Sequence, residues 1–315
     1  MKILITGGLG YIGSHLAQSL SRDRGHQIKI LSLNIPPLFE SWKEKHEIIQ
    51  ADITREDEIR RGCRDCDAVI HLASLDKQES QRDPRRALEV SIWGTRNILE
   101  EAVRNKVKRF IYFSTIHVYG IPQDEKIDEN SPINPLTDYS LARYAGELYC
   151  RQFRELHNLN AIVLRPSNGY GAPVHKDVDR WAEVVHDFSR SAFRRKKIVM
   201  ESEGSQRRDF VPISDIIQGT LLLLKAESSK IRYDTYNLGS GLNFSIREVA
   251  SSVKNAYQNL YGEEIQIEFA PDIISADIKK PFIYDISRMN KLGFRPRGPE
   301  ALEEEIEKIF RLLET

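Results

Sequence analysis

The sequence has few cysteines, no excess of either charge and no long hydrophobic run, and each shortage excludes a class of protein. With three cysteines among 315 residues, a disulfide framework is not expected. Cys63 and Cys66 have the C-x-x-C spacing of some zinc and redox sites, but no second pair of ligands accompanies them. We therefore expect no metal site.

Charge and hydropathy argue against polyanion and membrane partners. Lysine plus arginine and aspartate plus glutamate each total 46, so the formal net charge is zero and no overall field attracts nucleic acid. No stretch approaches the roughly eighteen apolar residues of a membrane span, and the apolar run at the N-terminus is too short for a signal peptide. The sequence predicts a cytoplasmic protein without nucleic acid or membrane partners.

The first half of the chain alternates short apolar runs with longer helical patterns, which is typical of βαβ units. A series of this kind predicts an α/β fold with a doubly wound, mostly parallel Rossmann sheet. Because the carboxyl ends of the strands then meet at one edge, functional residues should cluster just after the strands. The predicted strands are 2–5, 28–33, 47–51, 68–72, 109–114 and 161–164, and the predicted helices lie near 13–22, 55–63, 84–104 and 139–157.

The chain is long for one hydrophobic core, so a smaller C-terminal α/β domain is expected. Turn-forming residues at 165–171 mark the predicted boundary between a Rossmann domain at 1–166 and a substrate-binding domain at 167–315. Part of 212–242 is expected to pack back on the first domain. Further predicted elements are a helix ending near residue 224, a strand at 236–238 and an amphipathic helix at 300–313.

A glycine-rich turn follows the first predicted strand. Gly7, Gly10 and Gly13 have G-x-x-G-x-x-G spacing between a strand and a helix, with Tyr11 and Ile12 inside the motif. Without a Cβ, such glycines let backbone N–H groups approach a pyrophosphate at the positive end of the helix dipole. The alternative is a turn that only packs helix on strand. We expect the turn to bind a nicotinamide dinucleotide.

The residue that ends the second strand bears on the choice of cofactor. Rossmann units usually carry an acidic residue there to accept the ribose hydroxyls, but this chain has Ser32. No lysine or arginine at 33–42 is available to pair with a 2′-phosphate, so NAD is favoured and NADP stays open. Asp52, followed by Ile53, is expected either to accept from the adenine amino group or to cap the next helix. The remaining predicted cofactor-binding residues follow other strands: Leu72, Ala73, Ser74 and Pro166.

Short motifs along the chain carry a family resemblance. They are Thr6-Gly7-Gly8, His71-Leu72-Ala73, Gly94-Thr95, Val118-Tyr119-Gly120, Tyr139, Glu147, Leu164-Arg165-Pro166, Asn168 and Arg208-Asp209-Phe210-Val211. In these residues and in their order, the chain resembles the extended short-chain dehydrogenase/reductase family, in particular its NAD-dependent nucleotide-sugar epimerases and dehydratases. The resemblance implies NAD in the first domain and a nucleotide-diphosphate sugar against the second. It also implies a homodimer formed through the helices at 84–104 and 139–157.

The resemblance further implies a catalytic group. Tyr139 is the expected general base, and Thr115 is expected to hydrogen-bond the reacting oxygen of the sugar. Arg143 stands where the family has a lysine, one helical turn after Tyr139, and is expected to contact the cofactor. A phenol has an ordinary pKa of about 10 and needs positive charge nearby to act as a base. Arginine supplies that charge, but its wide, planar guanidinium group does not occupy the position of a lysine ammonium group. The alternatives are a capping hydroxyl for Thr115 and a buried aromatic anchor for Tyr139.

The resemblance also names substrate-binding positions. Asn168 matches an asparagine that contacts substrate, and its alternative is an ordinary turn residue. Ser91 replaces an asparagine common in the family, which predicts a looser backbone at the active site.

Recognition of the diphosphate is expected to differ from that of the family. The family's arginine near the C-terminus is missing, and Arg208 is the best candidate to replace it, with Lys279 and Lys280 as others. The alternative for Arg208 is an internal salt bridge to Asp209 or Asp215.

The residues after Thr115 bear on the reaction. Dehydratases of the resembling family carry an Asp-Glu pair there, whereas this chain has Ile116 and His117. We interpret His117 as a cleft-lining or packed histidine rather than a replacement acid. The sequence therefore predicts a 4-epimerase-like enzyme that transiently oxidises a nucleotide sugar and returns the hydride. Two alternatives stay open: an NAD(P)-dependent nucleotide-sugar reductase or dehydrogenase and, because Arg143 replaces lysine, a non-catalytic dinucleotide-binding protein.

Overall fold

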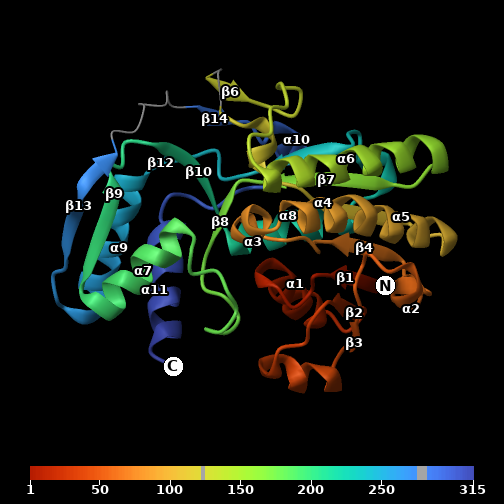
Figure 1. Ribbon diagram of the computed structural model, residues 1–315, viewed down its shortest axis with the longest axis horizontal. Helices are drawn as coiled ribbons and strands as arrows, with labels where there is room; N and C mark the ends of the chain where they lie inside the picture. Colours follow the sequence, from red (N-terminus) through yellow and green to blue (C-terminus); the bar gives the residue numbers. More distant parts are fainter. Residues whose placement is uncertain (122–124, 275–281) are drawn as a thin grey trace.

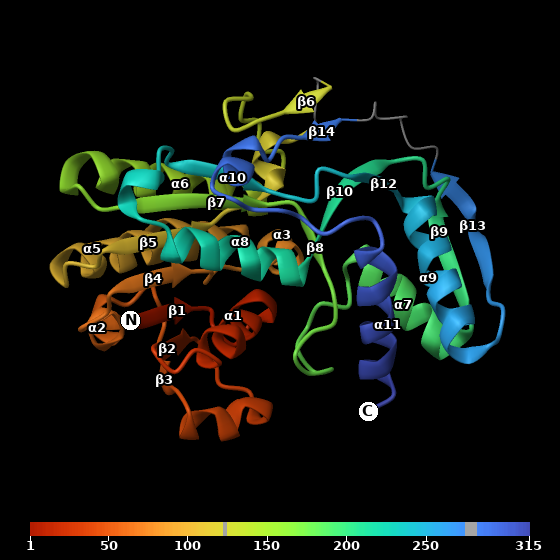
Figure 2. The same ribbon diagram turned by 180° about the vertical axis from the view of Figure 1, so that it is seen from behind.

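A parallel sheet is the centre of the computed structural model, which describes residues 1–121, 125–274 and 282–315. In the described residues the sheet has seven strands in the order β11-β7-β5-β4-β1-β2-β3, and every pairing is parallel (Figures 1 and 2). The order reverses between β1 and β4, which confirms the predicted doubly wound α/β fold. The strands are β1 (Lys2–Thr6), β2 (Gln27–Ser32), β3 (Glu47–Gln50), β4 (Ala68–His71), β5 (Arg109–Phe113), β7 (Ala161–Pro166) and β11 (Thr235–Leu238).

Helices cover both faces of this sheet. In β1, Ile3 and Ile5 belong to the core beneath α1 and α8, whereas Leu4 belongs to the core beneath α2, α5 and α6. Burial on both faces explains why the strands have continuous apolar runs rather than alternating ones. The helices of this lobe are α1 (Tyr11–Ser21), α2 (Glu56–Cys63), α3 (Lys77–Arg82), α4 (Pro84–Glu89), α5 (Thr95–Arg104), α6 (Asp138–His157) and α8 (Ile213–Lys225).

The predicted helix at 84–104 has an irregular centre. A π-helical turn, η2 (Val90–Gly94), joins α4 to α5, and Ser91 is buried in it. A Cβ on Gly94 would lie 2.5 Å from the Ile53 side chain, so glycine lets this turn approach the residues after β3. The sequence did not indicate α3 or the 3₁₀ turns η1 (Pro37–Glu44), η3 (Ile116–Tyr119) and η4 (Ser228–Lys230). None of the helices in the described ranges is both long and apolar enough to cross a membrane.

Three helices and several short strands form a second lobe (Figure 1). Helices α7, α9 and α11 share one apolar core with β9, which includes Val185, Val253 and Ile306. Helix α11 corresponds to the helix predicted at 300–313. The elements are β8 (Asn168–Tyr170), α7 (Val184–Arg195), β9 (Lys197–Ser202), β10 (Arg207–Pro212), β12 (Asn243–Ser245), α9 (Ile246–Tyr261), β13 (Gln266–Ile274) and α11 (Ala301–Leu313). The short strands β6 (Lys126–Ile127) and β14 (Ile283–Tyr284) pair with each other, and α10 (Ser287–Lys291) contacts β11 of the central sheet.

The prediction of a loop at 165–171 is wrong. Arg165 and Pro166 continue β7 because they pair with Asn237 and Leu238 of β11, and β8 begins two residues later alongside β10. The chain therefore returns from the second lobe to the central sheet through α8 and β11, as the pairing of the predicted strand at 236–238 shows. The domain boundary at residue 166 stays a prediction.

The C-x-x-C pair lies at the end of α2. Both thiols are free and buried, and burial raises the pKa of the Cys66 thiol to about 11. A thiol that stays protonated at neutral pH is a poor nucleophile and a poor metal ligand.

A buried ion pair ties α6 to the central sheet. Arg165 donates from Nε and Nη2 to the two carboxylate oxygens of Glu147, at 2.9 and 2.5 Å. Arg165 also donates to the Tyr119 hydroxyl at 2.7 Å, and the Ser114 hydroxyl donates to Glu147. Because both charged side chains are only 6% exposed, each depends on the other for compensation. The pair joins the ends of β5 and β7 to the helix that carries the predicted catalytic tyrosine.

Replacing one member of this pair should destabilise the fold. Glu147→Ala leaves the Arg165 charge buried and unpaired, which costs about 3–5 kcal/mol. Urea denaturation followed by circular dichroism should show a large drop in the unfolding midpoint. Arg151→Ala, on an exposed face of the same helix, removes only the surface pair with Glu155 and should leave the midpoint unchanged. Equal midpoints for the two variants would contradict this account.

Candidate active site

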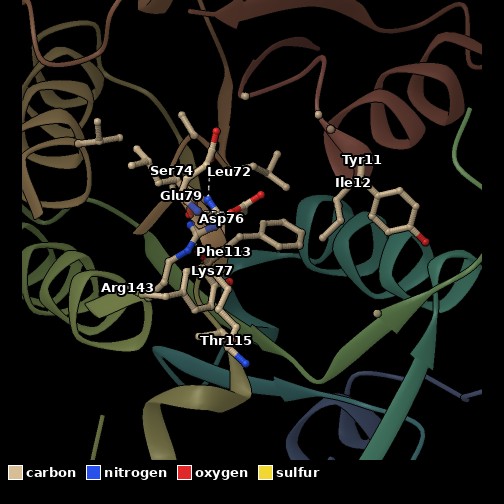
Figure 3. Close-up of a pocket in the computed structure, with 18 of the residues that line it drawn as sticks. Tyr11, Ile12, Leu72, Ser74, Asp76, Lys77, Glu79, Phe113, Thr115 and Arg143 are labelled. Atoms are coloured by element: carbon tan, nitrogen blue, oxygen red, sulfur yellow. Dashed lines mark hydrogen bonds between the residues drawn. The ribbon is translucent and has the colours of Figure 1, made fainter. Parts of the chain in front are cut away.

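A pocket of about 490 Å³ lies at the carboxyl edge of the central sheet and is lined by both lobes. In Figure 3, Tyr11 and Ile12 stand at the start of α1 on one side of it, and Arg143 and Thr115 stand on the other. Every predicted site residue that the structure describes lines this pocket: Gly7, Gly10, Tyr11, Ile12, Gly13, Ser32, Asp52, Ile53, Leu72, Ala73, Ser74, Thr115, Tyr139, Arg143, Pro166, Asn168 and Arg208. The structure thus brings all of them together, and their individual roles stay predictions.

The glycine turn has the geometry of an anion cradle. Gly7 has a φ of +66°, which favours glycine, and its N–H donates to the Leu31 carbonyl at 2.8 Å. A Cβ on Gly13 would lie 2.4 Å from the Gly7 carbonyl oxygen, so only glycine lets α1 start this close to β1. A Cβ on Gly10 would contact only that same oxygen, at 3.3 Å, and would otherwise project into open space.

The start of α1 has unused hydrogen-bonding capacity. In the described part of the chain, no side chain caps this helix and no acidic residue stands in its first turn. Its first N–H groups and the positive end of its dipole therefore remain available to a negative group. These observations fit the pyrophosphate of a dinucleotide.

Ser32 and Asp52 line the pocket next to the glycine turn. Ser32 is the last residue of β2, and Asp52 follows β3. Asp52 accepts from the Thr54 N–H at 2.9 Å and from the Thr54 hydroxyl at 2.7 Å, and it pairs with Arg86 at 2.5 Å. Burial acts to raise the pKa of Asp52, but these partners outweigh it and hold the pKa below its usual value. The proposed helix cap is wrong, because α2 has Arg55 at its N-cap and no side-chain cap.

The predicted base lies in the first turn of α6. Thr137 and Ser140 form a capping box that starts this helix, and Tyr139 between them faces the pocket. Thr115 follows β5, and its hydroxyl oxygen accepts the His117 N–H at 3.2 Å, which confirms the capping role offered as its alternative. Because that contact uses a lone pair, the hydroxyl proton remains free to be donated to a ligand.

Arg143 is anchored to the end of β5. Its Nη1 donates to the Phe113 carbonyl at 2.9 Å, and its guanidinium carbon lies 5.5 Å from the centre of the Tyr139 ring. Burial acts to lower the pKa of Arg143, but the oxygens of Tyr139 and Tyr112 outweigh it and raise the pKa. Its Nε is buried and has no hydrogen-bond partner among the described residues. A buried donor without an acceptor fits a site completed by a ligand hydroxyl, such as that of a ribose.

His117 lines the pocket beside this group, as interpreted from the sequence. Desolvation and then the positive charge of Lys77 lower the pKa of His117 to about 4. The imidazole is therefore neutral at pH 7 and can exchange hydrogen bonds but carries no charge.

The substrate-side residues are placed by β8 and β10. Asn168 lies in β8 and its amide donates to the Asp209 carbonyl at 2.8 Å, so the turn-residue alternative is wrong.

The salt-bridge alternative for Arg208 is also wrong. The Asp209 carboxylate accepts from Ser167 and Ser240, and Asp215 accepts the Arg297 N–H. Lys279 and Lys280 lie outside the described residues.

The chain matches the model of the NAD dependent epimerase/dehydratase family over residues 3–239. It belongs to this family. The resemblance seen in the sequence is thereby confirmed.

Relatives with different reactions share most of the chain. A putative UDP-glucose 4-epimerase from Methanocaldococcus jannaschii is 29% identical over 301 residues, which cover 93% of each chain. A dTDP-D-glucose 4,6-dehydratase from Mus musculus is 27% identical over 327 residues, which cover 97% of this chain and 88% of the relative.

Among solved structures, a variant of UDP-glucuronic acid 4-epimerase from Bacillus cereus, in complex with NAD and UDP-4-deoxy-4-fluoro-glucuronic acid, is 25% identical. Its TM-score is 0.84, and the match covers 100% of this chain and 99% of that chain.

Sequence reasoning missed part of the pocket of this family member. The loop before α7 contributes Asp179, Arg180 and Glu183, and the start of α3 contributes Lys77. Lys77 follows β4 closely, so the rule that functional residues follow strands was a usable signal. The loop before α7 lacks any regular pattern, and nothing local to it indicated a site.

A side chain at Gly10 should block the cofactor without disturbing the fold. The backbone there is extended, with φ −76° and ψ 179°, so any residue can adopt it. Gly10→Val should abolish quenching of intrinsic fluorescence by NAD and keep the thermal midpoint of the wild type. Gly25→Val, in a loop outside the pocket, should keep both the quenching by NAD and the thermal midpoint. Normal NAD affinity in Gly10→Val would show that the turn serves only packing.

Proposed function

We propose that this protein is an NAD-dependent nucleotide-sugar epimerase of the 4-epimerase type. The observation that carries the proposal is the convergence of Thr115, Tyr139 and Arg143 on the pocket that also contains the glycine turn. The second lobe is proposed to hold the nucleotide-diphosphate sugar. The named relatives and the B. cereus complex support this substrate class.

NAD rather than NADP is proposed as the cofactor. Arg86 lines the pocket beside Asp52, and its guanidinium is already paired with Asp52 and Glu89. A 2′-phosphate beside Ser32 would therefore meet no unpaired arginine from this segment. Bound NAD would supply a reversible acceptor for a hydride from the sugar carbon.

Tyr139, Thr115 and Arg143 are proposed to have different roles in the reaction. Tyr139 takes the proton of the sugar hydroxyl as that carbon is oxidised, and returns it when the carbon is reduced. The Thr115 hydroxyl donates to the same oxygen and holds it beside Tyr139. Arg143 keeps a permanent positive charge 5.5 Å from the centre of the Tyr139 ring, where it would stabilise the negative charge that develops during the proton transfer.

The residues after Thr115 favour epimerisation over dehydration. Elimination of water needs an acid and a base at the sugar, and the resembling dehydratases place Asp and Glu there. Ile116 is apolar and buried, and His117 is neutral at pH 7. An epimerase needs only oxidation, rotation of the ketosugar and reduction, for which the residues present suffice.

Tyr139→Phe should abolish turnover with little effect on binding. With NAD and UDP-glucose, UDP-galactose or their N-acetyl relatives, the wild type should interconvert C4 epimers without net NADH. Loss of the phenol proton should lower kcat by about a hundredfold to ten-thousandfold. Chromatography of the sugar products measures the interconversion of the epimers, and absorbance at the NADH band measures net NADH. Tyr144→Phe, on the same helix outside the pocket lining, is the matched control.

The alternatives give other results in the same assay. Stoichiometric NADH would indicate a dehydrogenase, and a 4-keto-6-deoxy product would indicate a dehydratase. Binding of NAD without turnover on the whole panel would indicate a non-catalytic dinucleotide-binding protein.

We also propose a homodimer through the face of α6 and η2. Trp93 is 52% exposed, and Leu141 and Leu148, seven residues apart on α6, are 44% and 48% exposed. Because η2 packs against α6, these apolar side chains lie on neighbouring elements. Burial against a second copy would remove them from water.

A charge in this face should dissociate the dimer. Leu148→Glu should reduce the mass measured by light scattering from twice the 36.3 kDa of the chain to that of one chain. Phe269→Glu, at an exposed position of β13, should leave the dimer intact. A wild-type monomer, or a dimeric Leu148→Glu, would contradict the proposal.

A further inference from the structure

Arg180 is a cation of the pocket to which the proposed chemistry gives no role. Its guanidinium carbon lies 5.0 Å from the centre of the Tyr11 ring, and its Nη2 donates to the Gly169 carbonyl at 3.2 Å. Tyr11 belongs to the glycine turn, and Gly169 belongs to β8. Arg180 therefore stands where the cofactor side of the pocket meets the second lobe.

One donor of Arg180 has no acceptor. Its Nε is buried and lacks a hydrogen-bond partner among the described residues, like the Nε of Arg143. The carboxylate of Glu183 approaches a different nitrogen, Nη1, at 3.5 Å. A buried N–H without an acceptor is costly and calls for a partner that the chain does not supply.

Arg180 shares its surroundings with Arg208. Both guanidinium groups act to lower the pKa of His117, which follows the predicted catalytic Thr115. Glu183 interacts electrostatically with Arg208 as well as with Arg180. Both positive groups therefore interact with the same acidic residue, and all three side chains line the pocket.

We propose that Arg180 and Arg208 together bind the diphosphate of the nucleotide sugar, with Arg180 replacing the arginine that is missing near the C-terminus. The inference rests on the proposed function. A guanidinium group matches phosphate oxygens in two parallel hydrogen bonds, and 273–280 contains no arginine. The pyrophosphate of NAD is already served by the N–H groups of the glycine turn, so the second diphosphate is the one that needs these cations.

Glu183 competes with the diphosphate for Arg180. Its carboxylate lies 3.5 Å from Nη1, and a bound diphosphate must outcompete it. Removing the negative charge of Glu183 should therefore strengthen diphosphate binding, whereas removing the charge of Arg180 should weaken it. A purely structural role for this loop predicts no such opposition of sign.

Isothermal titration of UDP and dTDP into the full-length protein saturated with NAD tests the inference. Arg180→Gln should weaken whichever diphosphate the wild type binds by about tenfold to a hundredfold, the range for hydrogen bonds to charged groups. Glu183→Gln should bind it more tightly than the wild type. NAD affinity should change less than about twofold in both, as expected for a contact that NAD does not share.

Arg195→Gln is the matched control. Arg195 is an exposed residue at the end of α7 and is not part of the pocket lining, so its loss should leave both affinities unchanged. Unaltered diphosphate affinity in Arg180→Gln, or weaker NAD binding in its place, would overturn the inference and leave the proposed function standing. Failure of the wild type to bind either diphosphate would overturn both.

Discussion

The parallel register of the central sheet is the constraint on which the site depends. Since all pairings in its described strands are parallel, the carboxyl ends meet at one edge, and the reversal of order between β1 and β4 opens a crevice there. The glycine turn follows β1, Ser32 ends β2 and Thr115 follows β5, so residues far apart in the sequence line one pocket. The ion pair of Glu147 and Arg165 then fixes α6, and with it the predicted base, against the ends of β5 and β7.

Two buried guanidinium nitrogens suggest how the pocket accommodates two ligands. The Nε of Arg143, from α6, and the Nε of Arg180, from the second lobe, both lack acceptors among the described residues. One stands beside the proposed catalytic group and the other beside the residues proposed to bind substrate, so a cofactor and a nucleotide sugar would each satisfy one of them. The unpaired Nε also offers a physical reason for Arg143 in place of lysine. A guanidinium group anchored to the Phe113 carbonyl keeps another N–H donor for a ligand.

The first lobe was predictable because its strands are buried on both faces. Burial of this kind leaves continuous apolar runs such as 110–113, and the glycine spacing identifies the turn after β1 without any alignment. The second lobe was not predictable in the same detail. Its strands β8 and β12 have three residues each, too few for a periodic pattern, and Arg165 continues β7 only because β11 returns from the C-terminal half to pair with it. Arg180 was missed because its position depends on the packing of a loop against Tyr11, a contact that no local spacing encodes.

The central claim is that the pocket at the carboxyl edge of the sheet holds NAD. Mass spectrometry of the nucleotide released when the purified protein is denatured, after incubation with equal amounts of NAD and NADP and removal of the excess, tests it directly. The account predicts NAD in the released fraction, because Ser32 and the paired Arg86 provide no site for a 2′-phosphate. Release of NADP, or of no dinucleotide at all, would contradict it.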